Sequence, residues 1–471
     1  MSDAKTTEPS GELSATAVGE IAARLDRLPS TWTVWKFIVL LSFGFFFELY
    51  DLLYSGYVAP GLVRSGIFTA TTTGLFGLTG IASFIAFLFL GLFAGTLGCG
   101  FLADKFGRRS IFTYSLLFYT GANLIMAFQN TAAGVNFWRF MAGLGIGVEL
   151  VTIDAYISEL VPKHVRGRAF AFSQALGFTS VPVVGLLAYV LVPHKPLGLD
   201  GWRWVVLIGA HGALFVWFIR RALPESPRWL AEKGRVADAE NVLSQIEARV
   251  RREYGGELPS PASAEIVEAR RRFRDVWTPP LRKRTVMLVV FNIFQTFGYY
   301  GFANWVPTLL LGQGITITAS MLYPFVIALA APIGPMVGLL LADRLERRTV
   351  IVASAGLITA FGLLFSHTSN GFLLVAIGAG LTLANNTMSY SFHAYQTELY
   401  PTSIRASGVG FVYSWSRFSA IFTSFFIAGI LRAFGTTGVF SSIAGAMVIV
   451  MLTIGLLGPK TLDLALEKIS H

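Results

Sequence analysis

The chain has 471 residues, of which 54% are hydrophobic and only 14% are charged. Soluble domains have about a quarter of their residues charged, so this composition excludes an ordinary soluble protein. The formal net charge of +10 could suggest a nucleic acid partner, but 15 of the 37 Lys and Arg residues fall in one hydrophilic block, 220–284, beside ten acids. A basic loop of this kind is typical of the cytoplasmic face of a membrane protein. We therefore expect an integral membrane protein that binds no nucleic acid.

Residues 1–34 form a polar segment of mixed charge. They lack the short apolar core and the small-residue cleavage site of a signal peptide. We therefore expect a cytoplasmic segment followed by a membrane span that is not cleaved. The single cysteine, Cys99, excludes a disulfide bond within the chain.

The first predicted span, 35–59, carries two acids into the membrane. It is longer than the roughly 20 apolar residues that cross a bilayer, yet it holds Glu48 and Asp51. A carboxylate at this depth costs about 2.5 kcal/mol or more. Glu48, Asp51 and Ser55 follow one another at i, i+3 and i+7, so they share one helix face. We expect that face to point into the protein or into a water-filled cavity.

Charge-free runs, separated by charges and by Gly and Pro clusters, predict twelve membrane-spanning helices. They lie near residues 35–59, 78–102, 110–129, 136–158, 168–192, 203–219, 286–310, 321–342, 349–366, 371–397, 408–431 and 437–458. Lys and Arg residues concentrate in alternate loops on the side of the basic block, which places that side and both termini in the cytoplasm. The expected location is a plasma membrane, such as a bacterial inner membrane. Within the basic block, residues 229–252 predict a soluble amphipathic helix.

Two motifs recur in the chain at the same offset of 239 residues. Residues 155–162 (AYISELVP), followed by Arg166, recur as residues 394–401 (AYQTELYP), followed by Arg405. Asp104, Arg108 and Arg109 recur as Asp343, Arg347 and Arg348. Such a repeat predicts two parallel halves of an all-α membrane protein, each a six-helix bundle. The expected parts are the N-terminal segment 1–34, the first bundle 35–219, the cytoplasmic linker with short helices 220–285, the second bundle 286–458 and the cytoplasmic tail 459–471.

The run from Gly100 to Arg109 (GFLADKFGRR) resembles the loop between helices 2 and 3 of the major facilitator superfamily. The segments RFMAGLGIG at 139–147 and PESPRWL at 224–230 are similar to its sugar-porter, organic-ion and synaptic-vesicle-like branch. The resemblance covers nearly the whole chain and implies a twelve-helix transporter that works by alternating access. One departure is Glu346, which stands in the second copy of the loop where the first has Gly107.

Two features resemble a narrower group within that branch. The run ELYD at 48–51 resembles the acidic pair of aromatic-acid/proton symporters, and Arg417 occupies the place where organic-anion and aromatic-acid carriers have an arginine in helix 11. The resemblance implies that Asp51 and Arg139 couple transport to protons. An arginine nearby favours the charged form of a buried carboxylate, so making and breaking this contact would change the proton affinity of Asp51. The alternative is a permanent structural ion pair, and Glu48 is either a second proton site or a partner of another helix.

Two further helices carry polar stripes at helical spacing, Asn292, Gln295 and Tyr299 in one and Asn386, Tyr390 and His393 in the other. In a two-bundle carrier such stripes face a shared cavity near the midplane, although hydrogen bonding between helices is an equal alternative. His393 could titrate near neutral pH, but a lone histidine is more often a structural donor.

Arg417 is the residue most suited to binding an anion. It lies twelve residues after Arg405, about 18 Å along a helix, which is close to the middle of a hydrocarbon core about 30 Å thick. Tyr413 shares its helix face. A guanidinium binds a carboxylate through two parallel hydrogen bonds and stays charged. The alternative is a structural pair with Glu149 or Asp154.

The repeated charged residues at the cytoplasmic ends predict a gate. We expect them to form ion pairs that lock the outward-open state, each contributing about 0–1 kcal/mol. The gate residues are Asp104, Arg108, Arg109, Glu159 and Arg166, with Asp343, Arg347, Arg348, Glu398 and Arg405 in the second half.

The sequence has no metal-ligand spacing, no nucleophile–base arrangement and no phosphate-binding loop, so we expect neither an enzyme nor a cofactor or metal. The predicted function is a proton-coupled symporter that imports a small organic anion, such as an aromatic carboxylate, as a monomer in the bilayer. A proton-coupled sugar or polyol carrier is the alternative, supported by residues 139–147 and 224–230. A non-transporting membrane sensor ranks third.

Overall fold

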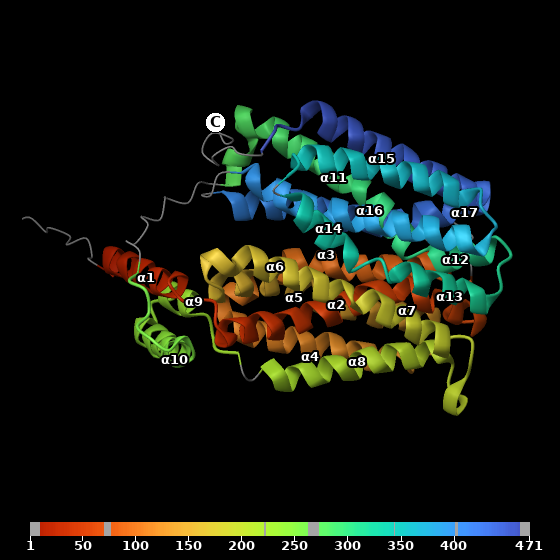
Figure 1. Cartoon of the computed structure of the whole chain (residues 1–471). Coiled ribbons are helices and arrows are strands. Elements are labelled where there is room, and N and C mark those ends of the chain that lie inside the picture. Colours follow the sequence, from red (N-terminus) through yellow and green to blue (C-terminus); the bar gives the residue numbers. More distant parts are fainter. Residues whose placement is uncertain are drawn as a thin grey trace, which may run out of the picture.

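The computed structural model describes residues 10–69, 77–220, 223–261, 273–342, 344–400 and 404–461. These residues are almost entirely helical and form no strand beyond one isolated bridge between Thr69 and Gly80. Figure 1 shows the helices as two layers, with the first half of the chain in one and the second half in the other.

The first half forms a bundle of six helical rods. Its helices are α2 (Trp32–Arg64), α3 (Ile81–Phe106), α4 (Arg108–Met126), α5 (Ala132–Leu160), α6 (Lys163–Phe178), α7 (Ser180–Leu191) and α8 (Gly201–Arg220). The short 3-10 helix η1 (Pro196–Gly198) precedes α8. The helix predicted at 168–192 is two helices, α6 and α7, which meet at Thr179. Pro182 explains the break, because it has no N–H to donate to the carbonyl four residues earlier.

The second half forms six rods as well. It contains η2 (Phe273–Trp277), α11 (Pro279–Ala303), α12 (Val306–Gly312), α13 (Ile317–Ala328), α14 (Ile333–Ala342), α15 (Arg347–Ser366), α16 (Gly371–Glu398) and α17 (Arg405–Leu457). Helix α17 bends back at Gly435, which has a positive φ of 65° and so separates the last two rods. The predicted helices 286–310 and 321–342 are interrupted before Pro307 and near Pro332, again where a proline removes a main-chain donor.

By length and composition, seven stretches of the described helices are apolar enough to cross a membrane. They are Trp32–Arg64, Lys163–Leu191, Leu281–Ala303, Ile317–Gly338, Arg347–Ser366, Gly371–Glu398 and Gly408–Leu457, the last of which contains two rods. A shorter apolar helix, Ile81–Leu97, lies in α3. The remaining rods pack alongside these spans in the first bundle. The predicted all-α fold of two six-helix bundles is therefore confirmed.

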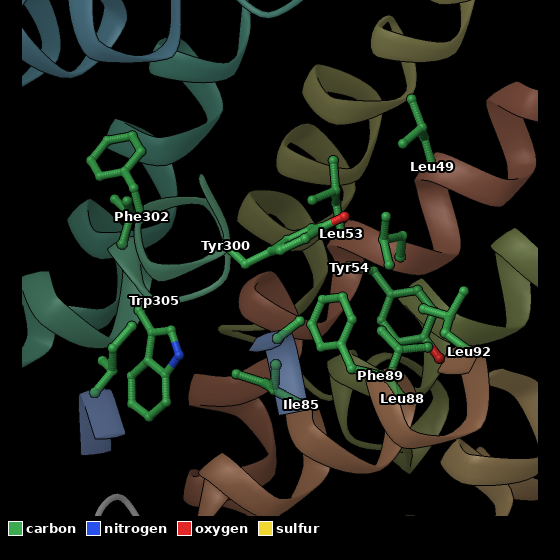
Figure 2. Packing of buried hydrophobic residues seen from close by; sticks show 14 of the residues in the cluster. Leu49, Leu53, Tyr54, Ile85, Leu88, Phe89, Leu92, Tyr300, Phe302 and Trp305 are labelled. Carbon is green, nitrogen blue, oxygen red and sulfur yellow. The ribbon is translucent and has the colours of Figure 1, made fainter. Parts of the chain in front are cut away.

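The two bundles meet along four pairs of helices, α3 with α17, α7 with α13, α2 with α12 and α6 with α14. Aromatic rings fill part of this interface: the rings of Phe89 and Tyr300 lie 4.6 Å apart, centroid to centroid (Figure 2). On the side remote from the termini the contact is closest at Gly56, where an added Cβ would lie 2.5 Å from the main-chain oxygen of Asn304. Glycine is therefore required where α2 crosses the break between α11 and α12.

Three helices outside the bundles cover one end of the first half: α1 (Ser10–Asp26), α9 (Pro227–Glu232) and α10 (Val236–Tyr254) (Figure 1). The prediction of a single amphipathic helix at 229–252 is wrong, because Gly234, with a φ of 74°, separates α9 from α10.

Ion pairs attach α1 to α10. Arg24 donates to Glu240 at 2.6 Å and to Glu247 at 2.7 Å, and Arg27 also pairs with Glu247. Burial opposes the charged form of Glu247, but hydrogen bonds from the two arginines outweigh it and lower the pKa of Glu247. At the end of α10, Glu253 accepts the main-chain N–H and the hydroxyl of Thr33 at the start of α2. The linker is thus fixed to the first bundle.

Candidate functional site

Asp51 in α2 and Arg139 in α5 face each other in the interior of the first bundle, where both side chains are almost completely buried. Nη1 of Arg139 donates to Oδ1 of Asp51. Nη2 donates to the main-chain carbonyl of Asp51 at 2.7 Å and to the Ser55 hydroxyl at 2.6 Å. Among the described residues, Asp51 is the only carboxylate in ion-pair contact with this guanidinium. The two residues predicted as the coupling pair therefore meet directly.

Two further side chains complete this site, and the sequence analysis identified neither. The Tyr54 hydroxyl accepts from Nη1 of Arg139 at 2.5 Å and donates to Oδ1 of Asn123 in α4 at 2.9 Å. The amide nitrogen of Asn123 donates to Oδ2 of Asp51. The guanidinium also lies over the rings of Tyr54 and Phe84, at 4.2 and 5.3 Å from the centroids, an arrangement that stabilises a buried cation. Every oxygen of the Asp51 carboxylate thus accepts a hydrogen bond.

Arg417 in α17 has a different environment. Its side chain is buried, and the residue is only 4% exposed. Nη1 donates to the Tyr300 hydroxyl at 2.5 Å and Nη2 to the Tyr413 hydroxyl at 2.9 Å, and the guanidinium lies 4.9 Å from the Tyr413 ring centroid. No carboxylate of the described residues lies within ion-pair distance of it. The acid within electrostatic reach is Glu48 of α2, in the opposite bundle.

A cavity of about 50 Å³ lies between the bundles. Its lining includes Leu53 and Tyr57 from α2, with Tyr299, Phe302, Asn385 and Asn386 from the second bundle. Two of the predicted substrate-binding residues, Tyr299 and Asn386, therefore face this space. The Asn386 amide donates to the Ala331 carbonyl at 2.9 Å, where the chain is interrupted between α13 and α14. The cavity combines aromatic rings with amide groups, as small-molecule sites commonly do.

The other predicted substrate-binding residues divide into two groups. His393 joins the Arg417 site, because its ring lies 5.3 Å from that of Tyr413, and its Nδ1 is 3.1 Å from the Ser389 carbonyl of its own helix. Gln295 reaches the Ser416 hydroxyl at 3.4 Å, next to Arg417 in sequence.

Asn292 and Tyr390 make other contacts among the described residues. The Asn292 amide donates to the Leu288 carbonyl of its own helix at 2.9 Å. The Tyr390 ring packs over Gly338 of α14, where an added Cβ would lie 2.6 Å from it. Side chains at helical spacing can thus serve packing as well as binding.

The predicted gate residues form two matching ion pairs at one end of the molecule. Nε of Arg108 donates to Glu159 at 3.0 Å, and Nε of Arg347 donates to Glu398 at 2.6 Å. Both members of each pair belong to the same bundle, so neither pair bridges the two halves. The gating role of these pairs stays a prediction.

Other gate residues bind main chain or the linker. Arg166 lies 3.5 Å from Asp26 of α1, the main-chain N–H of Arg109 donates to Glu225 at 3.1 Å, and Arg348 donates to the carbonyls of Gly455 and Gly458. The side chains of Asp104, Asp343 and Arg405 lie outside the described residues.

The departure at Glu346 has a structural reason. In the first half, Glu225 accepts the N–H groups of Arg108 and Arg109, and it lies so close to Gly107 (φ 97°) that an added Cβ would be 2.5 Å from its Oε2. Burial raises the pKa of Glu225, although the hydrogen bonds oppose this. In the second half Glu346 itself accepts the Thr461 N–H at 2.6 Å. In the first half a carboxylate of the linker binds the loop, whereas in the second half a carboxylate of the loop binds the C-terminal tail.

The sequence contains only weak signals for the site residues that were not predicted. Tyr54 lies three residues after Asp51, and Tyr300 follows the predicted Tyr299. Asn123 is an amide within an otherwise apolar turn of its helix, but nothing in the sequence indicates which helix it faces. Among the described residues, no group of three His, Cys, Asp or Glu side chains could hold a metal ion.

Comparison with known proteins places the chain in a family of transporters. Residues 37–471 match the family described as "Sugar (and other) transporter". The inner membrane metabolite transport protein YdjE of Escherichia coli is 28% identical over 96% of this chain and 98% of its own length. The niacin transporter NiaP of Acinetobacter baylyi is 27% identical over 96% of this chain and 99% of its own length. The xylose transporter XylE of E. coli has the same fold, with a TM-score of 0.73 at 17% identity, covering 92% of this chain and 99% of that one.

Proposed function

Because the chain belongs to the sugar (and other) transporter family, we propose that it is a proton-coupled symporter that imports a small organic anion by alternating access. It is a transporter and not an enzyme, as the sequence predicted. In this proposal it works as a monomer in a plasma membrane, with both termini in the cytoplasm, the segments 1–34, 220–285 and 459–471 outside the bilayer, and one bundle on each side of the substrate path.

The observation that carries the proposal is that the buried guanidinium of Arg417 has no counter-ion beside it among the described residues. A guanidinium that is removed from water loses several kcal/mol of hydration, which a counter-ion normally offsets. Arg139 has such a counter-ion in Asp51, whereas the hydrogen-bond partners of Arg417 among the described residues are the two phenol hydroxyls of Tyr300 and Tyr413. The two phenols each accept one hydrogen bond from the guanidinium without neutralising its charge. A substrate carboxylate would supply the missing negative charge and could accept two parallel hydrogen bonds.

The surroundings of Arg417 favour an aromatic carboxylate. Tyr299, Tyr300 and Tyr413 lie around the guanidinium. Tyr299 also lines the cavity, together with Tyr57 and Phe302. Such rings stack on a planar ring at a modest gain of about 0.5–1.5 kcal/mol per pair. The related protein of A. baylyi is named for niacin, which is a pyridine carboxylate. A substrate of this shape would match both the charge and the rings.

A sugar is the second candidate, and one specific observation supports it. Thr382, Asn385 and Asn386 line the cavity, and their side chains carry the hydroxyl and amide groups that bind sugar hydroxyls. Two comparisons agree: the D-xylose-proton symporter has the same fold at 18% identity, and the arabinose-proton symporter of Bacillus subtilis is 23% identical over 82% of this chain. The charge on Arg417 nevertheless favours the anion.

Energetics separate the two candidates. One proton carried with one monoanion moves no net charge, so uptake is driven by the pH gradient alone, at about 1.4 kcal/mol per pH unit. A proton carried with a neutral sugar also gains about 2.3 kcal/mol per 100 mV of membrane potential. We therefore expect uptake by proteoliposomes that responds to the pH gradient and hardly to voltage.

Variants of Arg417 test the site itself. Uptake of nicotinate and benzoate is compared with that of xylose and arabinose for the native protein, Arg417→Lys, Arg417→Ala and the control Arg282→Ala at an exposed position. Because lysine keeps the charge but not the planar fork, we expect Arg417→Lys to weaken carboxylate binding and Arg417→Ala to abolish it. A carrier that prefers a sugar, generates inward current with it and tolerates Arg417→Ala would contradict the anion proposal.

A further inference from the structure

We propose that Asn123 sets the proton affinity of the coupling site, because its side-chain amide must rotate by half a turn when Asp51 takes up a proton. The inference rests on the proposed function, since it deepens the coupling role assigned to Asp51. Asn123 is a positioning residue in this scheme: it carries no proton itself, but it decides which form of Asp51 the site accommodates.

The hydrogen bonds around Asp51 form a closed ring of four groups from three helices. Arg139 donates both to Oδ1 of Asp51 and to the Tyr54 hydroxyl; that hydroxyl donates to Oδ1 of Asn123, and the Asn123 amide nitrogen donates to Oδ2 of Asp51. A guanidinium has donors only. The Tyr54 oxygen therefore accepts from Arg139, and its own hydrogen points to Asn123. This requirement fixes the orientation of the amide, with its nitrogen toward Asp51.

The ring as it stands suits the charged carboxylate and no other form. A proton on Oδ2 of Asp51 would face the N–H of Asn123, so two donors would meet. A half-turn of the amide would relieve this, because the Asn123 oxygen would then accept from the protonated acid and its nitrogen would donate to Tyr54. The Tyr54 hydrogen would lose its acceptor in exchange, and a buried donor without a partner is costly. Protonation therefore requires the ring to open.

Asn123 is the one member of the ring that can be changed without removing a charge or an ionisable group. The charged and titratable groups around Asp51 are Arg139 on α5 and, on its own helix, Glu48 one turn earlier, Tyr50 and Tyr54. Tyr50 does not belong to the ring, since its hydroxyl donates to the Val205 carbonyl of α8 at 2.7 Å. From α3 the site receives the apolar ring of Phe84. A change at Asn123 therefore acts on proton affinity through a hydrogen bond alone.

The test is the pH profile of substrate accumulation in proteoliposomes, with counterflow at fixed pH as a measure of proton-independent exchange. Asn123→Leu keeps the shape of the side chain but removes its donor, so the protonated form of Asp51 becomes easier to reach. We expect the midpoint of the profile to move to higher pH by about one unit, the value of one hydrogen bond to a charged group. Counterflow should persist.

Two further variants sharpen the test. Tyr54→Phe removes the group that fixes the amide, so its profile should move in the same direction, and the double variant with Asn123→Leu should move no further than Asn123→Leu alone. The control is Thr120→Val, one turn earlier in α4, because its buried hydroxyl has no hydrogen-bond partner and its profile should not move.

The outcomes distinguish this inference from the proposed function. If the native protein accumulates no substrate in response to a pH gradient, the proposed function is wrong. If the native protein does so and Asn123→Leu has the native pH profile, only the inference about Asn123 is wrong. Equal loss of accumulation and of counterflow in a folded Asn123→Leu protein would assign the residue to substrate binding or packing and would also overturn the inference.

Discussion

Arg139 and Arg417 are both buried, and their different partners give them different chemistry. Arg139 is held by Asp51, Ser55 and Tyr54 within one bundle. Arg417 is held by phenols and faces the acid Glu48 only at a distance, across the interface. A buried ion pair that is closed suits a switch that opens once per cycle, whereas a buried cation without an adjacent anion suits a binding site.

Replacement of Asp51 by asparagine tests the first of these roles. The side chain keeps its shape, but it can neither bind nor release a proton. We expect Asp51→Asn to abolish uphill accumulation while counterflow of substrate across proteoliposomes persists, because exchange needs no net proton movement. Asp51→Glu, which keeps the titratable group, is the control and should retain some accumulation. A variant that still concentrates substrate with an unchanged pH profile would show that the coupling site lies elsewhere.

At the residue scale the sequence predicted charged residues better than neutral ones. A carboxylate or guanidinium in an apolar helix must find a partner, so Asp51, Arg139 and Arg417 could be identified from the sequence alone. Amides and phenols have no such constraint. Asn292 and Asn123 look alike in the sequence, yet one bonds to its own helix and the other to the coupling acid. Only the packing of the helices distinguishes them.

At the scale of the helices, length and hydropathy predicted how many rods there are but not where they break. The breaks lie just before Pro182 and Pro307 and at Pro332, and all three lie in helices that contact the other bundle. The break between α11 and α12 affects the contact between the bundles. It exposes main-chain atoms of Asn304, and Gly56 of α2 lies against them. This contact closes the side of the molecule remote from the termini.

A larger residue at this contact should hold that side open. A Cβ at position 56 would lie 2.5 Å from the Asn304 oxygen, a distance that no rotamer can relieve. We expect Gly56→Leu to reduce transport and to favour the outward-open state. The measurement is the labelling rate of Thr382→Cys in the cavity, in a Cys99→Ser background, by an impermeant reagent applied from outside. Gly410→Leu, at a glycine with open space around it, is the control. An unchanged labelling rate would contradict the assignment.

At the scale of the whole molecule, the internal repeat extends to individual contacts. Arg108–Glu159 and Arg347–Glu398 are related by the offset of 239, and so are Tyr156 and Tyr395, which donate to the carbonyls of Pro224 and Pro459. In each half, the segment that follows the last helix is thus bound to the same end of that half's own bundle. The two motifs that revealed the repeat in the sequence are the ones that form these contacts.

Because neither ion pair crosses between the bundles, a gating role must act through the shape of each bundle's end. Arg108 and Arg347 begin α4 and α15, and their partners lie in the last turns of α5 and α16. In this role each pair would hold two helix ends together, so that the ends of the two bundles can meet and close the side of the molecule that carries the termini. Removal of both pairs should loosen both ends at once and favour the inward-open state.

The double variant Glu159→Gln/Glu398→Gln tests this role. The carboxylates are 17% and 22% exposed, so each pair contributes only about 1 kcal/mol, and loss of both should shift the balance of states by about thirtyfold. We expect cysteines engineered on the cytoplasmic side of the cavity to be labelled faster, and those on the opposite side more slowly, in the Cys99→Ser background. Asp238→Asn, which removes an exposed pair on α10, should change neither rate. Equal labelling of the double variant and the native protein on both sides would assign the pairs to stability alone.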